Sequence, residues 1–413
     1  MRRKRTNWTA VAVASALFGF SFYALVTWLE QGLLSDVPVY VHYANLMRGG
    51  AFPYRDFAFE YPPAALPVML VPSYMTWSYA TSFAVLMGVC GAGCIALVAS
   101  ALREVEAGPL RTWAALLLVG ASPLILGSLF DSRYDLWPTL LAVGALAALI
   151  RERPFVTGAL LALGFAAKLW PGALLPIAAA YLWRRRGSDS ALAAVGTFVV
   201  VAAACFVPFA VVAPDGLHHM FADQLGRPLQ VESLGAAVLM ALQHLGMRAV
   251  STIDSHGGQA LSGRGAGLAA DLSSALEILA VIAIWIWFAR LRRPGAEEVL
   301  IAAAATVCAL VAFDKVLSPQ YLIWLVPFVA LVRGGVGLTV GALVVVALGL
   351  TQTWFPTHYW SLALQHKSPW SWYLLLRDLA LVGLAVVLAL ELNRARGSEA
   401  RRERWPAARR AGA

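Results

Sequence analysis

The stretch PFVTGALLALGFAAKLWPGALLPIAAAYLWRRR, residues 154–186, is too long for one membrane helix and carries Lys168 and Pro171 near its middle. Arginines flank it on both sides, in RER at 151–153 and RRR at 184–186. A helix crosses the bilayer with about 20 apolar residues, and arginine-rich loops stay on the cytoplasmic side. Both ends are therefore expected on the same side. The stretch predicts a hairpin of two short helices, with Lys168 at its tip in the outer half of the membrane.

The composition is that of a membrane protein with many spans. Of 413 residues, 60% are hydrophobic and 13% are charged, and the mean hydropathy is +0.70. Soluble domains carry about 25% charged residues. The net charge of +9 could suggest a nucleic-acid partner, but the arginines lie in short runs between apolar segments, so no nucleic acid is expected. The cysteines lie within apolar runs and the histidines lack metal-ligand spacing, which predicts neither disulfides nor a metal site.

Other apolar runs predict about ten full spans besides the hairpin, and hence an all-α polytopic membrane protein. The predicted spans are 8–28, 79–101, 112–129, 135–150, 191–212, 272–290, 298–313, 317–332, 335–353 and 372–392. The basic start MRRKR precedes a run long enough for an uncleaved span. With this start in the cytoplasm, every dense arginine cluster falls on the cytoplasmic side. We expect a multi-pass protein of a bacterial plasma membrane, with both termini in the cytoplasm.

The predicted topology gathers polar residues at the outer face. One membrane domain, 1–393, has a first outer loop at 29–65 and a long outer loop at 213–271, and an arginine-rich cytoplasmic tail follows at 394–413. The polar residues that fall outside are Asp36, Asp56, Glu60, Asp131, Arg133, Asp135, Lys168, Arg227, Glu232, Asp314, Lys315, His358 and Lys367. Charges within apolar sequence need partners or a water-filled cavity. We therefore expect an outward-facing site whose cations suit a lipid-linked phosphate and whose carboxylates could supply a general base.

The acids of the first outer loop also have structural interpretations. Asp36 precedes Pro38 and an amphipathic run that stops at Gly49, so it could be the N-cap of a surface helix. Capping and catalysis are compatible. Glu60 could be a solvated loop acid, and Asp56 is expected to be structural.

The cations and the histidine have such alternatives too. Lys168 could pair with a neighbouring acid, and Arg133 could form a salt bridge within its own loop. Lys315 could pair locally with the adjacent Asp314. His358 lies in TWFPTHYW and could belong to an interfacial aromatic belt.

Four motifs occur in a recognisable order along the chain. They are SDVPVYVHYANLMRGGAFPYRDFAFEYPP, ALLALGFAAKLWPGALLPIAAAYLWRRR, RPLQVESL and DKVLSPQYLIWLVPF. This ordered set resembles glycosyltransferase family 87, the polyprenyl-phosphomannose-dependent mannosyltransferases of actinobacteria and their relatives. The resemblance extends over residues 30–370. It implies a GT-C fold, with about 10–12 membrane helices, short helices on the outer surface and an active site that faces outward.

The resemblance also implies roles for individual residues. It makes Asp36 the general base, with Glu60 as the second candidate acid, and it makes Lys168 and Lys315 ligands of the carrier phosphate. The further residues expected to bind phosphate or sugar are Arg133, Arg227, Gln320, Tyr321 and His358. The family often has Gly-Gln-Asn-type residues where this chain reads SLFDSRYDLWP, a departure that bears on the identity of donor or acceptor. No cofactor is implied, and the need for a divalent metal is left open.

The implied reaction moves a hexose, with mannose favoured, from a polyprenyl-phosphate donor to a lipid or glycan acceptor, with inversion at the anomeric carbon. Two other functions stay open. A transporter or flippase for a lipid-linked sugar would use the same cations without chemistry, although few acids lie on the cytoplasmic side. A ligase or polymerase would move a preassembled glycan, although the outer loops are small for so large a donor.

Overall fold

The long apolar runs form helices. The computed structural model describes residues 7–24, 34–247 and 249–411, with side chains as far as Ala395. Within these residues, seven helices are long and apolar enough to cross a membrane. They are α4 (Tyr79–Glu104), α5 (Pro109–Leu126), α10 (Ser188–Val212), α13 (Ala266–Ala289), α14 (Ala296–Phe313), α16 (Gly334–Trp354) and α18 (Trp370–Ala411). The chain is thus an all-α polytopic membrane protein, as predicted.

Three further predicted spans correspond to shorter apolar helices. They are α1 (Trp8–Ala24), α7 (Leu136–Leu149) and the continuous pair η5 (Pro319–Tyr321) and α15 (Leu322–Ala330). Residues 25–28 of the first predicted span lie outside the described residues. In the described part of the chain, each of the ten predicted spans thus corresponds to an apolar helix, and seven of these helices are long enough to cross a membrane.

The stretch 154–186 forms the predicted hairpin. Its elements are α8 (Pro154–Ala167), the single turn η4 (Trp170–Leu174) and α9 (Leu175–Arg186). The start and the end of the hairpin are in contact: Arg185 Nε lies 2.9 Å from Glu152 Oε1. Lys168 lies between α8 and η4, at the closed end of the hairpin.

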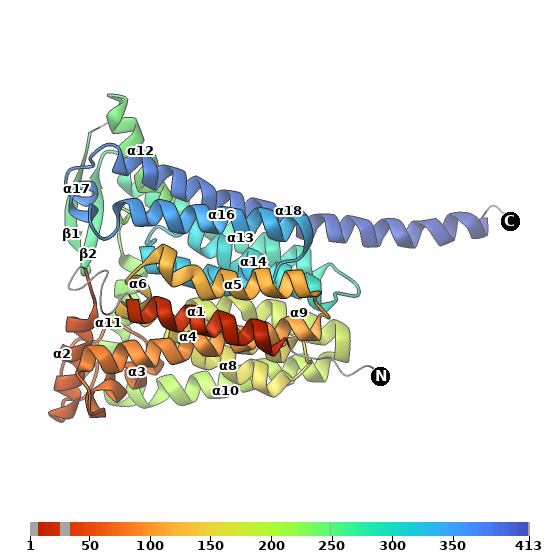
Figure 1. The fold of residues 1–413 in the computed structure, drawn as a ribbon, viewed down its shortest axis with the longest axis horizontal. Helices are drawn as coiled ribbons and strands as arrows, with labels where there is room; N and C mark the ends of the chain where they lie inside the picture. The colour runs from red at the N-terminus through yellow and green to blue at the C-terminus, as the bar shows by residue number, and fades with distance from the viewer. Residues whose placement is uncertain (1–6, 25–33, 248, 412–413) are drawn as a thin grey trace.

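The arginine-rich connections converge at the end of the bundle from which α18 projects in Figure 1. Arg111 Nη1 lies 2.5 Å from Glu297 Oε1, and Arg111 Nη2 lies 2.5 Å from the Leu331 carbonyl oxygen. Arg184 Nη2 donates to the carbonyl of Ala289 at 3.1 Å. These connections come from different parts of the sequence and lie together, as the arginine pattern predicts. That this end faces the cytoplasm stays a prediction.

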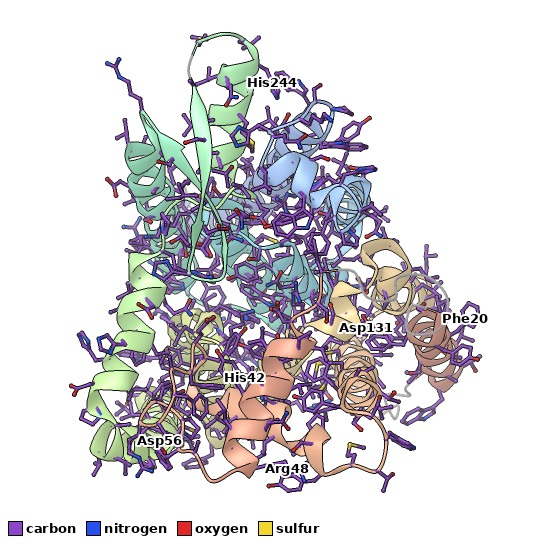
Figure 2. The ribbon with its side chains drawn as sticks, turned by 90° about the vertical axis from the view of Figure 1, so that its left-hand side faces the viewer. Phe20, His42, Arg48, Asp56, Asp131 and His244 are labelled. Carbon is purple, nitrogen blue, oxygen red and sulfur yellow. The ribbon has the colours of Figure 1, made fainter. Side chains whose placement is uncertain are left out.

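The opposite end of the bundle carries the polar segments (Figure 1). The elements there are α2 (Val37–Arg48), α11 (Pro214–Gly226), α12 (Leu234–His244), α17 (Tyr359–Ala363) and the antiparallel strands β1 (Val250–Ser255) and β2 (Gly258–Gly263). Short turns complete the connections: η2 (Pro63–Ala65), α3 (Leu66–Leu70), η3 (Val71–Tyr74) and α6 (Leu129–Ser132). Figure 2 views this end, with Arg48 of α2 and His244 of α12 toward opposite edges.

The segment 213–271, predicted as one long loop, is thus built of two helices and a β-hairpin. Of the predicted first outer loop, residues 29–33 lie outside the described residues.

Two backbone contacts hold these polar segments together. A Cβ at Gly216 would overlap the Tyr54 carbonyl, so α11 lies against the first outer loop only because glycine stands there. The β-hairpin is bound to the segment before α12, since the Val231 N–H donates to the Gln259 carbonyl at 3.0 Å. Segments far apart in sequence therefore form one continuous wall at this end.

Candidate active site

A cavity of about 770 Å³ opens within the polar end of the bundle. Most of the residues predicted to act in catalysis or binding line it: Asp36, Glu60, Arg133, Lys168, Arg227, Lys315, Gln320 and Tyr321. His358 is not among the lining residues. Its exposed ring stacks on Trp370 with 4.0 Å between the ring centroids.

Asp36 occupies the N-cap position of α2, and the helix stops before Gly49, as predicted. However, the Asp36 side chain accepts no capping hydrogen bond. Its Oδ1 lies 2.9 Å from Arg133 Nη1, and its Oδ2 accepts from the Tyr40 hydroxyl at 3.4 Å. One third of the side chain, 33%, stays accessible. Burial raises the pKa of the Asp36 carboxyl, and the charge of Arg133 opposes that rise.

Arg133 therefore forms a salt bridge to the N-cap residue of α2. Its Nη2 also donates to the Leu34 carbonyl at 3.3 Å. Arg133 is 8% exposed, so it is a fixed part of the wall that holds the segment before α2 in place.

Lys168 pairs with a neighbouring acid at the tip of the hairpin. Its Nζ lies 2.6 Å from Asp135 Oδ1, and Trp324 Nε1 donates to the same oxygen at 2.6 Å. Nζ also lies 4.9 Å from the centroid of the Tyr321 ring and 5.1 Å from that of Tyr134. Aromatic faces attract a cation at such distances. Lys168 thus has a carboxylate partner and still faces the cavity.

Arg227 and Lys315 are bound differently, through backbone carbonyls. Arg227 Nη2 donates to the carbonyl of His256 at 2.7 Å, and Lys315 Nζ donates to that of Leu225 at 2.9 Å. Among the described residues, neither forms an ion pair with a carboxylate. The adjacent Asp314 accepts instead from the Val316 N–H at 2.8 Å. These two cations are suited to bind an anion in the cavity.

The other acids of the first outer loop differ in position. Glu60 lines the cavity, and its carbonyl accepts from Gln224 Nε2 at 3.1 Å. Asp56 does not line the cavity: it forms an exposed pair with Arg55 at 2.8 Å and accepts from the Phe52 N–H at 2.7 Å. The hydrogen bond to Phe52 agrees with the structural role expected for Asp56.

Four further acids line the cavity that were not predicted as site residues: Asp135, Glu232, Glu277 and Asp314. Three of them belong to the polar residues predicted outside. Glu277 is new, and it lies on α13 within an apolar run. An ionisable residue in such a run is by default a candidate for function, so the sequence did contain a signal for it. In the described part of the chain, no group of His, Cys, Asp and Glu is arranged to hold a metal ion.

A comparison with known families agrees with these features. The model of glycosyltransferase family 87 matches residues 59–319. The matched range contains Glu60, Arg133, Lys168 and the two cations that bind backbone carbonyls, and it begins after Asp36. No curated protein matches the chain.

Proposed function

Because the chain belongs to glycosyltransferase family 87, it is a membrane glycosyltransferase, and we propose that it transfers a hexose, with mannose favoured, from a polyprenyl-phosphate donor to a hydroxyl group of a lipid or glycan acceptor. One observation carries the proposal: the Asp36 carboxylate and the charged groups of Arg227 and Lys315 line the same cavity. Attack of a hydroxyl on a phosphate-activated sugar requires a proton acceptor and a cationic site for the leaving group.

In the proposed reaction, Asp36 takes the proton of the acceptor hydroxyl while the oxygen of that hydroxyl bonds to the anomeric carbon. The bond between that carbon and the phosphate oxygen breaks, and its electron pair goes to the phosphate. Arg227 and Lys315 stabilise the charge that develops there. The phosphate leaves as an anion, so no general acid is needed. Attack from the face opposite the leaving group inverts the anomeric centre.

The remaining cavity residues support these groups. Arg133 orients Asp36 and favours its ionised form. Lys168, at the hairpin tip, is a second ligand for the carrier phosphate, with Gln320 and Tyr321 on the same wall. Glu60 is the second candidate for the base.

We further propose that the cavity faces outward from a bacterial plasma membrane, in a GT-C arrangement with both termini in the cytoplasm. Support comes from the arginine-rich connections, which lie together at the other end of the bundle. A polyprenyl carrier stays in the bilayer, so its phosphate would reach the cavity at the level of the membrane surface.

The donor class can be tested directly. Membranes that contain the protein are incubated with polyprenyl phosphates carrying radiolabelled mannose, glucose or galactose, and in parallel with the matching nucleotide sugars. We expect label to pass from one polyprenyl-phosphate sugar into a new glycosidic product, and no transfer in Asp36→Asn membranes. Transfer from a nucleotide sugar alone would refute the donor class. Movement of the intact labelled lipid between leaflets, without a new glycosidic bond, would favour the flippase.

A further inference from the structure

Glu232 is a buried carboxyl group on the cavity wall that the proposed reaction does not use. It lies in the segment before α12 and is 2% exposed. Its Oε2 atom has no hydrogen-bond partner, although the residue lines the cavity. A buried polar atom without a partner costs about 1–3 kcal/mol. Such an atom beside a cavity indicates that a ligand group completes its hydrogen bonding.

The Glu232 segment is fixed from behind by a buried ion pair on α18. Arg377 Nη2 donates to the Glu232 carbonyl at 2.7 Å, and Arg377 Nε lies 2.7 Å from Asp378 Oδ1. Both members of the pair are 0% exposed. The Arg377 guanidinium also lies over the ring of Trp354, 5.5 Å from its centroid. Arg377 thus holds the backbone of Glu232 and lies within ion-pair distance of Asp378; among the described residues, no ion pair joins it to the Glu232 side chain.

The chemistry around Glu232 suits a neutral, hydroxyl-rich ligand. Burial raises the pKa of Glu232 to about 7, with the Tyr359 hydroxyl and the Gln230 amide facing the carboxyl. Near neutral pH such a group can donate or accept a hydrogen bond, as a sugar hydroxyl can. An anionic phosphate would be repelled by the ionised form of Glu232, whereas Arg227 and Lys315 are cations of the same cavity that form no ion pair with a carboxylate among the described residues.

Next to these groups, the cavity wall has an open aromatic surface. Trp360 follows Tyr359 in α17 and lines the cavity, while half of its surface, 50%, remains exposed. The two rings lie 5.1 Å apart at 75°. Binding sites for small molecules combine such apolar aromatic walls with a few fixed polar groups. An aromatic ring and a carboxyl group on the wall of one cavity are the two kinds of group that suit the apolar face and polar edge of a pyranose ring.

We propose that Glu232, Tyr359 and Trp360 form the subsite for the acceptor sugar, in which Glu232 binds a ring hydroxyl and Trp360 packs against the ring. This inference rests on the proposed function, since it assigns to the acceptor a part of the cavity that the donor phosphate does not occupy. The subsite positions the acceptor so that another of its hydroxyl groups reaches Asp36. Glu232 and Trp360 are specificity residues and not members of the proton-transfer machinery.

Binding without turnover tests the subsite. Purified protein in nanodiscs is titrated with octyl α-mannoside as the acceptor probe and, separately, with a polyprenyl phosphate that carries no sugar. We expect Glu232→Ala and Trp360→Ala each to weaken octyl mannoside binding about tenfold, the effect of one lost buried hydrogen bond or ring contact. Polyprenyl phosphate should bind both variants as it binds the wild type. Glu232→Gln, which keeps a hydrogen-bonding group, should recover most of the affinity.

Trp183→Ala is the matched control, since Trp183 is an exposed tryptophan, 65% accessible, on α9 next to the arginine-rich end. It should bind octyl mannoside normally. The inference is overturned if the Trp360→Ala protein, folded by size exclusion and thermal unfolding, binds octyl mannoside as the wild type does. It is equally overturned if polyprenyl phosphate binding falls instead. A failure of the proposed function appears elsewhere, as absence of sugar transfer by the wild-type protein, and leaves this binding result interpretable.

Discussion

Arg133 Nη1 lies 2.9 Å from Asp36 Oδ1, and this ion pair joins the start of α2 to the turn before α7. The two residues come from different segments at the polar end of the bundle, so the pair fixes where the carboxylate sits relative to the hairpin tip. It also sets the charge balance on the proposed base, since burial and Arg133 act on the pKa of Asp36 in opposite directions.

Replacing the proposed base should abolish transfer while donor binding persists. We expect Asp36→Asn to lower the transfer rate by about 10²–10⁴-fold, the usual contribution of a general base. Asn keeps the shape of the side chain but cannot accept the proton. Rates with the polyprenyl-phosphate sugar and binding of the sugar-free carrier measure the two effects. Retained turnover in this variant would reject the assignment and direct attention to Glu60.

The pH dependence of the reaction should report the environment of Asp36. Burial raises the pKa of this carboxyl, and only the ionised form can accept a proton. Transfer should therefore decline as the pH falls through the raised pKa. In Arg133→Gln the opposing positive charge is gone, so the decline should begin at a higher pH than in the wild type. Arg55, which forms an exposed pair with Asp56 away from the cavity, offers a control. Arg55→Gln should leave the pH profile unchanged.

Lys168 carries both a binding and a structural role, and a double variant separates them. Lys168→Ala leaves the buried carboxylate of Asp135 without its cation, which we expect to cost about 3 kcal/mol of stability, besides weakening donor binding. Lys168→Met combined with Asp135→Asn removes both charges and keeps an acceptor for Trp324 Nε1. Thermal unfolding should recover in the double variant while carrier binding stays weak. Recovery of carrier binding as well would show that Lys168 is only structural.

The buried pair on α18 should matter for stability. Arg377→Leu leaves Asp378 buried without a partner, and we expect a loss of about 3–5 kcal/mol, measured by unfolding in nanodiscs. The double change Arg377→Leu and Asp378→Leu should cost less than either single change. On the same helix, Arg394 and Glu391 form an exposed pair at 3.7 Å, so Arg394→Leu should change stability little. Equal effects at both sites would contradict this account.

Labelling of single cysteines tests the proposed orientation. In a background where Cys205 is changed to Ser, Arg55→Cys and Ser188→Cys place exposed thiols at opposite ends of the bundle. The other three cysteines are buried. A membrane-impermeant maleimide added to intact cells should label position 55, and position 188 only after lysis. The reverse pattern would invert the topology.

The sequence predicted the hairpin at 154–186 and the helical spans because both follow from local properties. Apolar length identifies a span, and flanking arginines identify its side. The same arginines predicted that both ends of the hairpin would lie on the same side, and the contact of Arg185 with Glu152 places them at the same end of the bundle. The described ends of α7 and of η5 with α15 lie within two residues of the predicted spans 135–150 and 317–332.

Pairing between distant residues could not be predicted in this way. No property of the sequence indicates that Arg133 binds Asp36, or that Lys168 binds Asp135, because these contacts depend on how helices pack. The apolar run around Glu277 likewise does not tell which face of α13 meets the cavity. Sequence analysis therefore identified the residue types of the site but not which cations remain free.

The β-hairpin was missed for a different reason. Its strands are separated by two residues, His256 and Gly257, whose φ angles of 50° and 69° are both positive. Two-residue hairpin turns of this kind usually carry Asn-Gly or Asp-Gly. Because His-Gly is an unusual pair for such a turn and further glycines lie nearby, the segment was predicted as an irregular loop.

In the hairpin at 154–186, the length of α8 determines where Lys168 lies. Both of its arms start from the arginine-rich end, so the number of residues in α8 sets how far Lys168 stands from that end. One inserted residue would advance the lysine by about 1.5 Å and turn it by about 100°, away from the carboxylate of Asp135. Within this enzyme, insertions and deletions in α8 should therefore be tolerated less than substitutions on its lipid-facing side.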